Sequence, residues 1–342
     1  MKILLIMDPG IPVPPLTYGG HERLVYMFAE EFTKLGHQVS LLAGPNSVVT
    51  GKVHAFGSNN LKRSKWQKTK ELLFVWKFLS VNKKNFDLVH NFGRLAYLIP
   101  ILNISVGKIM TYGRPVSKNG IRIITSMPYK NLIFTACSDY CVGTGNVAGL
   151  WKTVYNAIDF SKYQLQEKVN IDAPLMFLGR LDKVKGVHHA INIAIKSGST
   201  LFIGGNIPDT QDNLEYYEKM LKPFFDGKQI IYLGALNDHE KNKYLGMSKA
   251  LLFPIDWNEP FGMVMLEAMA CGTPVIAFNK GSVKEIISNG ENGFIVHNEE
   301  EMLNILPKIA TINRALCRAT VEKKYDIKIV ANDYLAIFKD DK

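Results

Sequence analysis

The sequence predicts an α/β protein made of two Rossmann-like domains, each a parallel sheet with helices on both faces. Apolar runs of about six to eight residues alternate with helical segments, and this alternation starts again in the second half of the chain. With 342 residues, the chain is long enough for two domains of ordinary size. Its 47% hydrophobic and 21% charged residues are normal for a globular protein.

The first half opens with a buried strand followed by an amphipathic helix. Residues 2–8 form an apolar run, which predicts a buried parallel strand. After a Pro- and Gly-rich loop, residues 21–35 place Leu, Val and Phe side chains on one side of a predicted helix. Further strands are predicted at residues 39–43, 87–91, 109–112, 132–136 and 153–156.

A polar stretch without periodicity, residues 159–172, indicates a linker. The pattern then restarts with a strand at 175–178, a Gly-Arg loop and a helix over 185–196, and a later helix is predicted over 263–271. We therefore place the first domain at residues 1–160 and the second at 161–325. Two such domains would leave a cleft where the carboxyl ends of both sheets meet. The remaining strands of the second half are predicted at residues 201–203, 230–233, 251–255 and 275–278.

The most informative stretch runs from Glu259 to Glu267, with the sequence EPFGMVMLE. Glu259 is predicted on a loop at the entrance of a helix, and Glu267 about two turns in. The N–H groups of Phe261, Gly262 and Met263 would lie free at the helix N-terminus, which suits an anion. A nucleotide sugar fits this spacing, with its sugar at Glu259, its ribose at Glu267 and its diphosphate between them. The alternative is a core helix with two solvated glutamates.

Two cations follow the first strand of the second domain. Arg180 lies at the end of that strand, and Lys185 lies at the start of the next helix. Both would bind a diphosphate and stabilise the charge that grows on it as a leaving group. The alternative is a pair of surface cations near a turn. Lys183, between them, is expected to be solvated.

The first long loop ends at residues 18–23, YGGHER, where a helix begins. Gly20 would allow a phosphate to approach the backbone closely. On its own this is a weak signal. The chain has no G-x-G-x-x-G fingerprint after its first strand and no Walker loop, which argues against dinucleotide or P-loop chemistry. It also has no Asp-x-Asp pair, so no metal and no cofactor are expected.

Three of these runs resemble the motifs of retaining glycosyltransferases with the GT-B fold, glycosyltransferase family 4 (glycosyl transferases group 1). The run Glu259-Pro-Phe-Gly, together with AMACGTPVIA at residues 268–277, closely resembles the E-x7-E motif of this family. Residues 179–186, GRLDKVKG, resemble the G-R-x-x-x-x-K-G signature, and residues 19–23 resemble the Gly-Gly-x-Glu-Arg loop. The resemblance covers most of the chain. It implies that the two domains face each other across a cleft, and that the last helix, within residues 326–342, returns to the first domain.

The resemblance also implies an activity. A hexose would move from a nucleotide diphosphate sugar, a UDP-sugar in preference to a GDP-sugar, to an acceptor hydroxyl. The first domain would bind the acceptor and the second the donor. In the implied front-face displacement the leaving diphosphate takes the proton of the acceptor. Arg180 and Lys185 would be the main catalytic groups, and Glu259 would orient the sugar. A GT-B sugar-nucleotide epimerase and a basic polyanion-binding protein without enzymatic activity are the alternatives.

One feature of the family is missing. Related enzymes often carry a His in the loop after a strand of the first domain, near the donor sugar. The corresponding segment here, residues 109–115, contains Tyr112, Gly113 and Arg114 but no His. The departure leaves the sugar contacts and the choice of acceptor open. His90 lies at the end of another strand, and we interpret it as a buried structural His.

The net charge of +10 is concentrated in the first half. Residues 1–168 hold 21 Lys/Arg and 9 Asp/Glu, whereas residues 169–342 hold 20 and 22. Such asymmetry suggests an anionic partner for the first half. Residues 61–84 hold eight basic residues and one acidic, with Trp66, Trp76 and Phe78 among them. Peripheral membrane contact through this segment is one interpretation. A solvated basic face is the other, and we favour it.

Other partners and compartments leave fewer signals. No recognisable nucleic-acid motif is found, so no nucleic-acid partner is expected. The first apolar run is too short for a signal peptide, and no run is long enough to span a membrane. The four cysteines lack the spacing of a zinc site or a disulfide framework. We expect a cytoplasmic protein, at most peripheral on the inner face of a membrane, and the sequence gives no signal for an oligomeric state.

Overall fold

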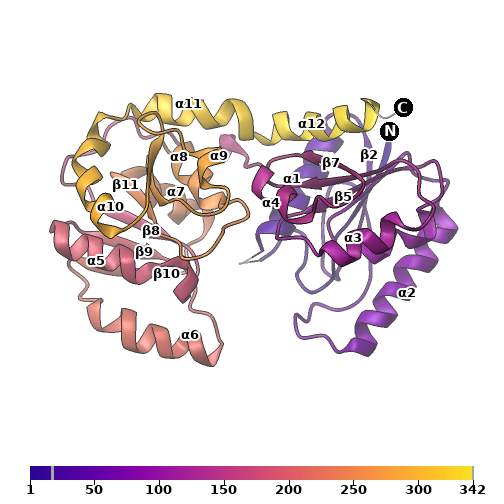
Figure 1. Cartoon of the computed structure of the whole chain (residues 1–342), viewed down its shortest axis with the longest axis horizontal. Helices are drawn as coiled ribbons and strands as arrows, with labels where there is room; N and C mark the ends of the chain where they lie inside the picture. The colour runs from indigo at the N-terminus through magenta and orange to yellow at the C-terminus, as the bar shows by residue number, and fades with distance from the viewer. Residues whose placement is uncertain (17–18, 341–342) are drawn as a thin grey trace. The chain divides into compact units, whose positions relative to one another are not determined.

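The structure, a computed structural model, describes residues 1–16 and 19–340 and divides into two compact units. The first unit comprises Met1–Ala157 and Ile327–Lys342, and the second comprises Ile158–Asp326. Each unit contains one sheet with helices around it (Figure 1). Tyr18, at the start of the YGGHER run, and the last two residues of the predicted terminal helix lie outside the described residues.

The first unit is built on a seven-stranded sheet in which each neighbouring pair is parallel. Its strand order is β3-β2-β1-β4-β5-β6-β7, so the chain moves outward from β1, returns to the middle and continues on the other side. The two neighbours at this reversal, β1 and β4, define the topological switch point. The strands are β1 (Lys2–Ile6), β2 (Gln38–Ala43), β3 (Lys52–Ala55), β4 (Leu88–Asn91), β5 (Gly107–Tyr112), β6 (Leu132–Ala136) and β7 (Leu150–Thr153).

Both faces of this sheet are buried. Successive side chains of a strand point to opposite faces, and in β1 Ile3 and Leu5 belong to one core while Leu4 and Ile6 belong to another. This explains why the strand is an unbroken apolar run rather than an alternating one. The helices of the first unit are α1 (Gly20–Lys34), α2 (Lys65–Asn82), α3 (Lys118–Thr125), α4 (Asp139–Gly145) and α12 (Ile327–Asp340).

Helix α12 packs into the first of these cores, although it follows the whole second unit in sequence. The ring centroid of Tyr334 lies 5.1 Å from that of Phe28 in α1 and 4.5 Å from that of His90 in β4. Phe338 covers the start of β5 so closely that a Cβ atom on Gly107 would lie 2.1 Å from its ring. The first unit therefore draws its core from residues more than 200 positions apart in the sequence.

The second unit repeats the plan with six strands. Its sheet has the order β10-β9-β8-β11-β12-β13, again with each neighbouring pair parallel, and the reversal lies between β8 and β11. The strands are β8 (Leu175–Leu178), β9 (Leu201–Gly204), β10 (Ile230–Gly234), β11 (Ala250–Phe253), β12 (Val275–Phe278) and β13 (Gly293–Val296). The helices are α5 (Val187–Ser197), α6 (Gln211–Tyr216), α7 (Asp238–Met247), α8 (Met263–Ala270), α9 (Val283–Ile286), α10 (Glu299–Ile305) and α11 (Arg314–Tyr325).

The predicted fold class is confirmed, with differences at the sheet edges. The strand predicted at 153–156 is β7, which ends at Thr153. The sequence missed β3 and β13, which have four residues each and lie at the edge of a sheet. Short edge strands are half exposed and lack the long apolar run of a central strand. The four cysteines are buried, and none of them forms a disulfide. In the part of the chain that the structure describes, no helix combines the length and hydropathy needed to cross a bilayer.

Candidate active site

Two loops meet at the switch point of the second unit, where β8 and β11 pair side by side. The loop after β8 carries Arg180 and Lys185, and the loop after β11 carries Glu259. Gly186 has φ +72°, and a Cβ atom there would lie 1.8 Å from the carbonyl oxygen of Pro254. In addition, the N–H of Asp256 donates to the carbonyl of Val184 at 2.8 Å. The two loops are thus fastened together at the place where α/β sheets bind ligands.

Lys185 and Glu259 form an ion pair across these loops. The Lys185 Nζ lies 2.5 Å from Glu259 Oε2, and the side chains are only 17% and 12% exposed. The indole Nε1 of Trp257 donates to the same carboxylate oxygen at 2.8 Å, and the Lys185 ammonium lies 4.9 Å from the centre of the indole ring. A cation and a carboxylate that are 74 positions apart in sequence therefore share one site.

Asp182 holds both predicted cations in place. Its carboxylate lies 2.9 Å from an Nη2 of Arg180. It also accepts from the backbone N–H of Lys185 at 3.2 Å, which caps the short 3-10 turn Lys183–Lys185. Sequence reasoning missed this residue. The signal was present, because an Asp directly before a helical turn is a typical N-cap. Lys183, predicted to be solvated, is exposed.

The backbone of Glu259 is held by the loop after β12. A Cβ atom on Gly281 would lie 2.2 Å from the carbonyl oxygen of Glu259, and the N–H of Ser282 donates to that oxygen at 3.0 Å. The Ser282 hydroxyl also donates to the carbonyl of Phe261 at 3.0 Å. Gly281 and Ser282 were not predicted, since their role depends on contacts to residues about twenty positions earlier. They fix the entrance of α8.

Helix α8 begins at Met263 and ends at Ala270. Gly262 precedes it with φ +88°, a conformation that favours glycine, and a Cβ there would lie 2.7 Å from Cε of Met265. Phe261 is buried with its ring edge-on to Tyr325. The first N–H groups of an α-helix have no carbonyl four residues earlier in the helix to bond, which is why helix starts can bind anions. In α8 the N–H of Met265 donates to the carbonyl of Gly262 at 3.0 Å.

Glu267 is the fifth residue of α8, so it lies little more than one turn from the helix start. The prediction that Glu267 lies about two turns into the helix was wrong. The separation of eight positions from Glu259 to Glu267 would span two turns only if the whole segment were helical, and the part from Pro260 to Gly262 is not. Glu267 is buried, and its Oε1 accepts from Lys241 Nζ at 2.9 Å. Burial alone would lower the pKa of Lys241, but the charges of Glu267 and Asp238 raise it. Burial, then the charge of Glu267, raises the pKa of Tyr163 well above its usual range.

Gly20 belongs to the first unit and opens α1. The space beside it is open, because a Cβ atom there would have no heavy atom within 4 Å. The constrained residue is its neighbour Gly19, with φ +155°, where a Cβ atom would lie 2.8 Å from Pro15. The structure thus brings Arg180, Lys185, Glu259, Phe261, Gly262, Met263 and Glu267 into one unit and places Gly20 in the other.

The two histidines near β4 and β5 differ in their surroundings. His90 is fully buried, its Nε2 lies 2.7 Å from the Thr111 hydroxyl, and burial lowers its pKa to about 3. The prediction that His90 is buried is confirmed, and its Nδ1 has no hydrogen-bond partner among the described residues. His21 in the first turn of α1 lies against Gly113, where a Cβ atom would be 1.6 Å from its Nε2. Burial and then the charge of Arg114 lower the pKa of His21 to about 4, so it is neutral near pH 7. Segment 109–115 thus contacts a His supplied by a distant helix.

A second cluster near the site has the ligand types of a metal centre. His188, His189 and Asp256 place ring nitrogens and a carboxylate oxygen within 4.8 Å of one another. The Nε2 of His189 lies 3.1 Å from Asp256 Oδ2, and its Nδ1 lies 2.7 Å from Glu299 Oε1. Nitrogen and carboxylate donors of this kind could hold a divalent cation. Without an ion, His189 links two carboxylates. Sequence reasoning missed this cluster because Asp256 is far from the histidines in sequence.

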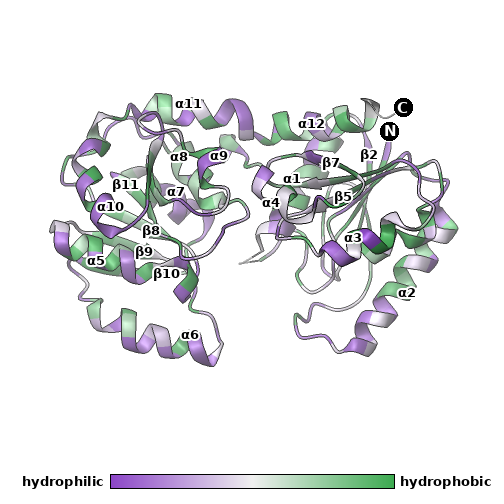
Figure 2. Ribbon diagram, in the orientation of Figure 1, coloured by the Kyte–Doolittle hydropathy of each residue, from purple (hydrophilic) through white to green (hydrophobic). Residues whose placement is uncertain are grey.

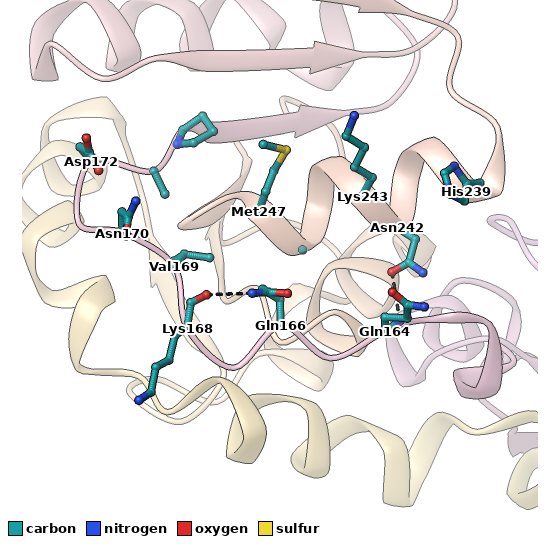
Figure 3. A pocket seen from close by; sticks show the side chains of 13 residues that line it. Gln164, Gln166, Lys168, Val169, Asn170, Asp172, His239, Asn242, Lys243 and Met247 are labelled. Carbon is teal, nitrogen blue, oxygen red and sulfur yellow. Dashed lines mark hydrogen bonds between the residues drawn. The ribbon is translucent and has the colours of Figure 1, made fainter.

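A hollow within the second unit is lined by other residues. It has a volume of about 800 Å³ and is lined by the segment from Gln164 to Pro174 and by one side of α7 (Figure 3). Its wall is tied together by the backbone N–H of Gln164, which donates to Asn242 Oδ1 at 3.0 Å. None of its described lining residues is a predicted site residue. The candidate site is therefore defined by the loops after β8 and β11 and by α8.

Comparison with known proteins shows which family and which folds this chain resembles. The model of the family described as "Glycosyl transferases group 1" matches residues 159–318. An uncharacterized 41.2 kDa protein in the cps region of Klebsiella pneumoniae is 25% identical over 90% of this chain and 86% of its own length. Sucrose-phosphate synthase from Thermosynechococcus elongatus has a similar structure, with a TM-score of 0.79 and 19% identity over 99% of this chain and 98% of that one.

HepE from Anabaena, solved in complex with UDP-glucose, has a TM-score of 0.75 and 17% identity over 99% of this chain and all of that one. These structural neighbours share the fold of this chain, whose two parallel sheets have seven and six strands. The matched range includes Arg180, Lys185, Glu259 and Glu267. The chain therefore has the GT-B fold, and its residues 159–318 match the family described as "Glycosyl transferases group 1".

Proposed function

We propose that this chain is a family 4 hexosyltransferase that moves a hexose from a nucleotide diphosphate sugar to an acceptor hydroxyl with retention of configuration. The observation that carries the proposal is the meeting of Arg180, Lys185 and Glu259 on two fastened loops at a switch point. Cations suit a diphosphate, and a carboxylate suits sugar hydroxyls. HepE, solved with UDP-glucose, supports a UDP-sugar in preference to a GDP-sugar as the donor.

We propose that the donor binds by replacing the ion pair between Lys185 and Glu259 with contacts of its own. A diphosphate oxygen would accept from the Lys185 ammonium in place of Glu259. The carboxylate would then be free to accept from hydroxyls of the hexose, while Trp257 continues to hold its Oε2. Arg180, which is partly exposed, would contact the same diphosphate. Donor binding would thus pair both cations with the diphosphate and orient the sugar at Glu259.

In the proposed reaction the bond between C1 of the hexose and the diphosphate oxygen breaks, and its electron pair leaves on that oxygen. The acceptor oxygen forms the new bond to C1 on the same face. The proton of the acceptor hydroxyl passes to the departing phosphate oxygen. Arg180 and Lys185 stabilise the charge that grows on the diphosphate, and such preorganised contacts act mainly in the transition state.

Glu267 is proposed to take the ribose. It is buried one helical turn from the entrance of α8 and is oriented by Lys241, so its carboxylate has a defined position. The diphosphate would lie between Glu259 and Glu267, beside the N–H groups of Phe261, Gly262 and Met263. Gly20, in the first unit, is proposed to contact the donor phosphates as well. No metal or cofactor is required by this scheme.

The donor can be tested by thermal unfolding with UDP, GDP and ADP. A ligand at a hundred times its dissociation constant should stabilise the folded chain by about 2.7 kcal/mol. We expect UDP to stabilise most, and Arg180→Ala to remove much of the effect. NMR of the product formed from UDP-glucose would then give the anomeric configuration. Stabilisation by none of the nucleotides would contradict the proposal. A changed nucleotide sugar formed without an acceptor would instead show an epimerase.

A further inference from the structure

Helix α2 of the first unit is covered on one side only. Its buried residues are Glu71, Val75 and Leu79, which face the core, and the opposite side has no covering element among the described residues. The outer side carries apolar residues that are far more exposed than such residues usually are. Trp66 is 66%, Leu73 54% and Val81 73% exposed.

These exposed residues form a single stripe with lysines between them. Positions 66, 70, 73, 77 and 81 recur at the spacing of one helix face, and they are occupied by Trp, Lys, Leu, Lys and Val. The Lys70 ammonium lies 5.1 Å from the centre of the Trp66 ring. The stripe is about 22 Å long at 1.5 Å per residue. Figure 2 shows the first turns of α2 as mainly hydrophilic and its later turns as mainly hydrophobic.

The surroundings of the stripe are basic. Residues 61–84 hold eight Lys and Arg and one acidic residue, Glu71. Glu71 is buried and paired, with its carboxylate 2.6 Å from Nη2 of Arg94 and 3.5 Å from Nε of Arg63. Within residues 61–84, therefore, no exposed acidic side chain offsets the lysines. The predicted aromatic anchors are partly corrected, because Trp76 donates to the carbonyl of Ala96 and Phe78 packs against the core.

We infer that the outer face of α2, residues 61–84, docks the first unit on a membrane surface that contains anionic lipid. The exposed Trp66, Leu73 and Val81 would enter the interface between head groups and acyl chains, and Lys70 and Lys77 would contact lipid phosphates. The sequence favoured the interpretation of this segment as a solvated basic face. That interpretation does not explain why Trp66, Leu73 and Val81 are exposed. Membrane docking accounts for both the lysines and the apolar residues.

The charges decide between a membrane and other occupants. A second copy of this chain would bring two faces of the same positive charge together, which opposes a symmetric dimer through α2. A nucleic acid would be attracted by the lysines, but it offers no apolar layer to Leu73 and Val81. An anionic bilayer matches both properties of the face. The inference needs no substrate, so it stands or falls separately from the proposed donor.

The test uses the full chain and sedimentation with lipid vesicles. We expect binding to phosphatidylcholine vesicles that contain phosphatidylglycerol, weak binding to phosphatidylcholine alone, and release in high salt. The double variant Lys70→Glu/Lys77→Glu should bind at least tenfold more weakly, and so should Leu73→Ser/Val81→Ser. These side chains are exposed, so folding should be unaffected. A matched control in the second unit is Leu316→Ser/Lys323→Glu, also on an exposed helix face, which should bind like the unchanged chain.

Fluorescence gives a second readout. Trp66 should shift its emission to the blue when vesicles are added, as measured by the difference between the unchanged chain and Trp66→Phe. The inference is overturned if the chain does not bind anionic vesicles at low salt, or if the stripe and control variants lose binding equally. It is also overturned if α2 variants change only self-association or only the binding of single-stranded RNA. Lost nucleotide binding with intact vesicle binding would reject the donor proposal and keep this one.

Discussion

Arg180 and Lys185 face the same charge in the proposed reaction, and each is already held by a carboxylate in the structure. We expect Arg180→Ala and Lys185→Ala each to lower kcat by a hundredfold or more, because a contact that forms in the transition state is worth about 3–4 kcal/mol. The matched control is Lys183→Ala, which removes an exposed cation from the same loop. Steady-state kinetics with unchanged thermal unfolding would check this. Turnover within a few-fold of the unchanged chain in both variants would reject the assignment.

The two glutamates should respond differently to substitution. Glu267→Ala should raise the donor KM by about tenfold to a hundredfold with little change in kcat, because a contact to the ribose is equal in ground and transition states. Glu259→Ala should mainly lower kcat, because the geometry of the sugar changes during reaction. Since Glu267 also neutralises Lys241, Glu267→Gln serves as a control for local packing. The opposite kinetic pattern would mean that the donor runs the other way across the site.

His90 makes the first unit sensitive to acid. Burial lowers its folded pKa to about 3, so the unfolded chain binds a proton first as the pH falls below about 6.5. The stabilising contribution of the neutral, buried His to the free energy of unfolding is therefore complete above pH 6.5. It decreases as the pH falls from 6.5 toward the folded pKa, by roughly 1.4 kcal/mol per pH unit for one His. His21, with a pKa lowered to about 4, acts in the same direction. Urea unfolding of the first unit at pH 7 and pH 5 should show the loss, and His90→Gln should reduce it by about half.

At the scale of single elements, β5 and α12 are packed so closely that a larger residue between them should destabilise the first unit. A Cβ atom on Gly107 would lie 2.1 Å from the Phe338 ring, and Gly107 does not have positive φ, so the limitation is space alone. We expect Gly107→Ala to destabilise the first unit by about 1–3 kcal/mol, as overpacking does. Phe338→Leu in the same chain should recover part of this loss. Denaturant unfolding of both variants measures it, and additive losses would show that the two residues do not compete for space.

The central elements were predictable from the sequence because their signals are local. Strands such as residues 132–136 and 275–278 are continuous apolar runs, and their observed bounds match the prediction. The contacts that build the site are not local. Asp182, Gly281 and Ser282 act through backbone groups of other loops, and His21 reaches Gly113 from 92 positions away. A single sequence shows which residues carry charge, but the pairing of Lys185 with Glu259 depends on the sheet order.

For the molecule as a whole, the proposed reaction should run without a divalent metal. Arg180 and Lys185 provide the positive charge that a metal would otherwise supply. An assay in excess EDTA should keep most of the rate, and the variant His188→Gln/His189→Gln should show whether the nearby cluster contributes. Complete loss of activity that Mg²⁺ or Mn²⁺ restores would contradict the mechanism. Restoration that requires His188 and His189 would assign the effect to their cluster.

The position of α12 has a consequence for how the chain folds during synthesis. The ribosome releases residues 1–157 first, but the core around Phe28 and His90 lacks Tyr334 and Phe338 until the whole second unit and α12 have been synthesised. The second unit, whose residues are contiguous, can close earlier. Part of the apolar core of the first unit therefore stays exposed to solvent while the second unit is synthesised. Chaperones protect such exposed apolar surfaces during synthesis. Late nascent chains should accordingly be the form of this protein that is most prone to misassembly.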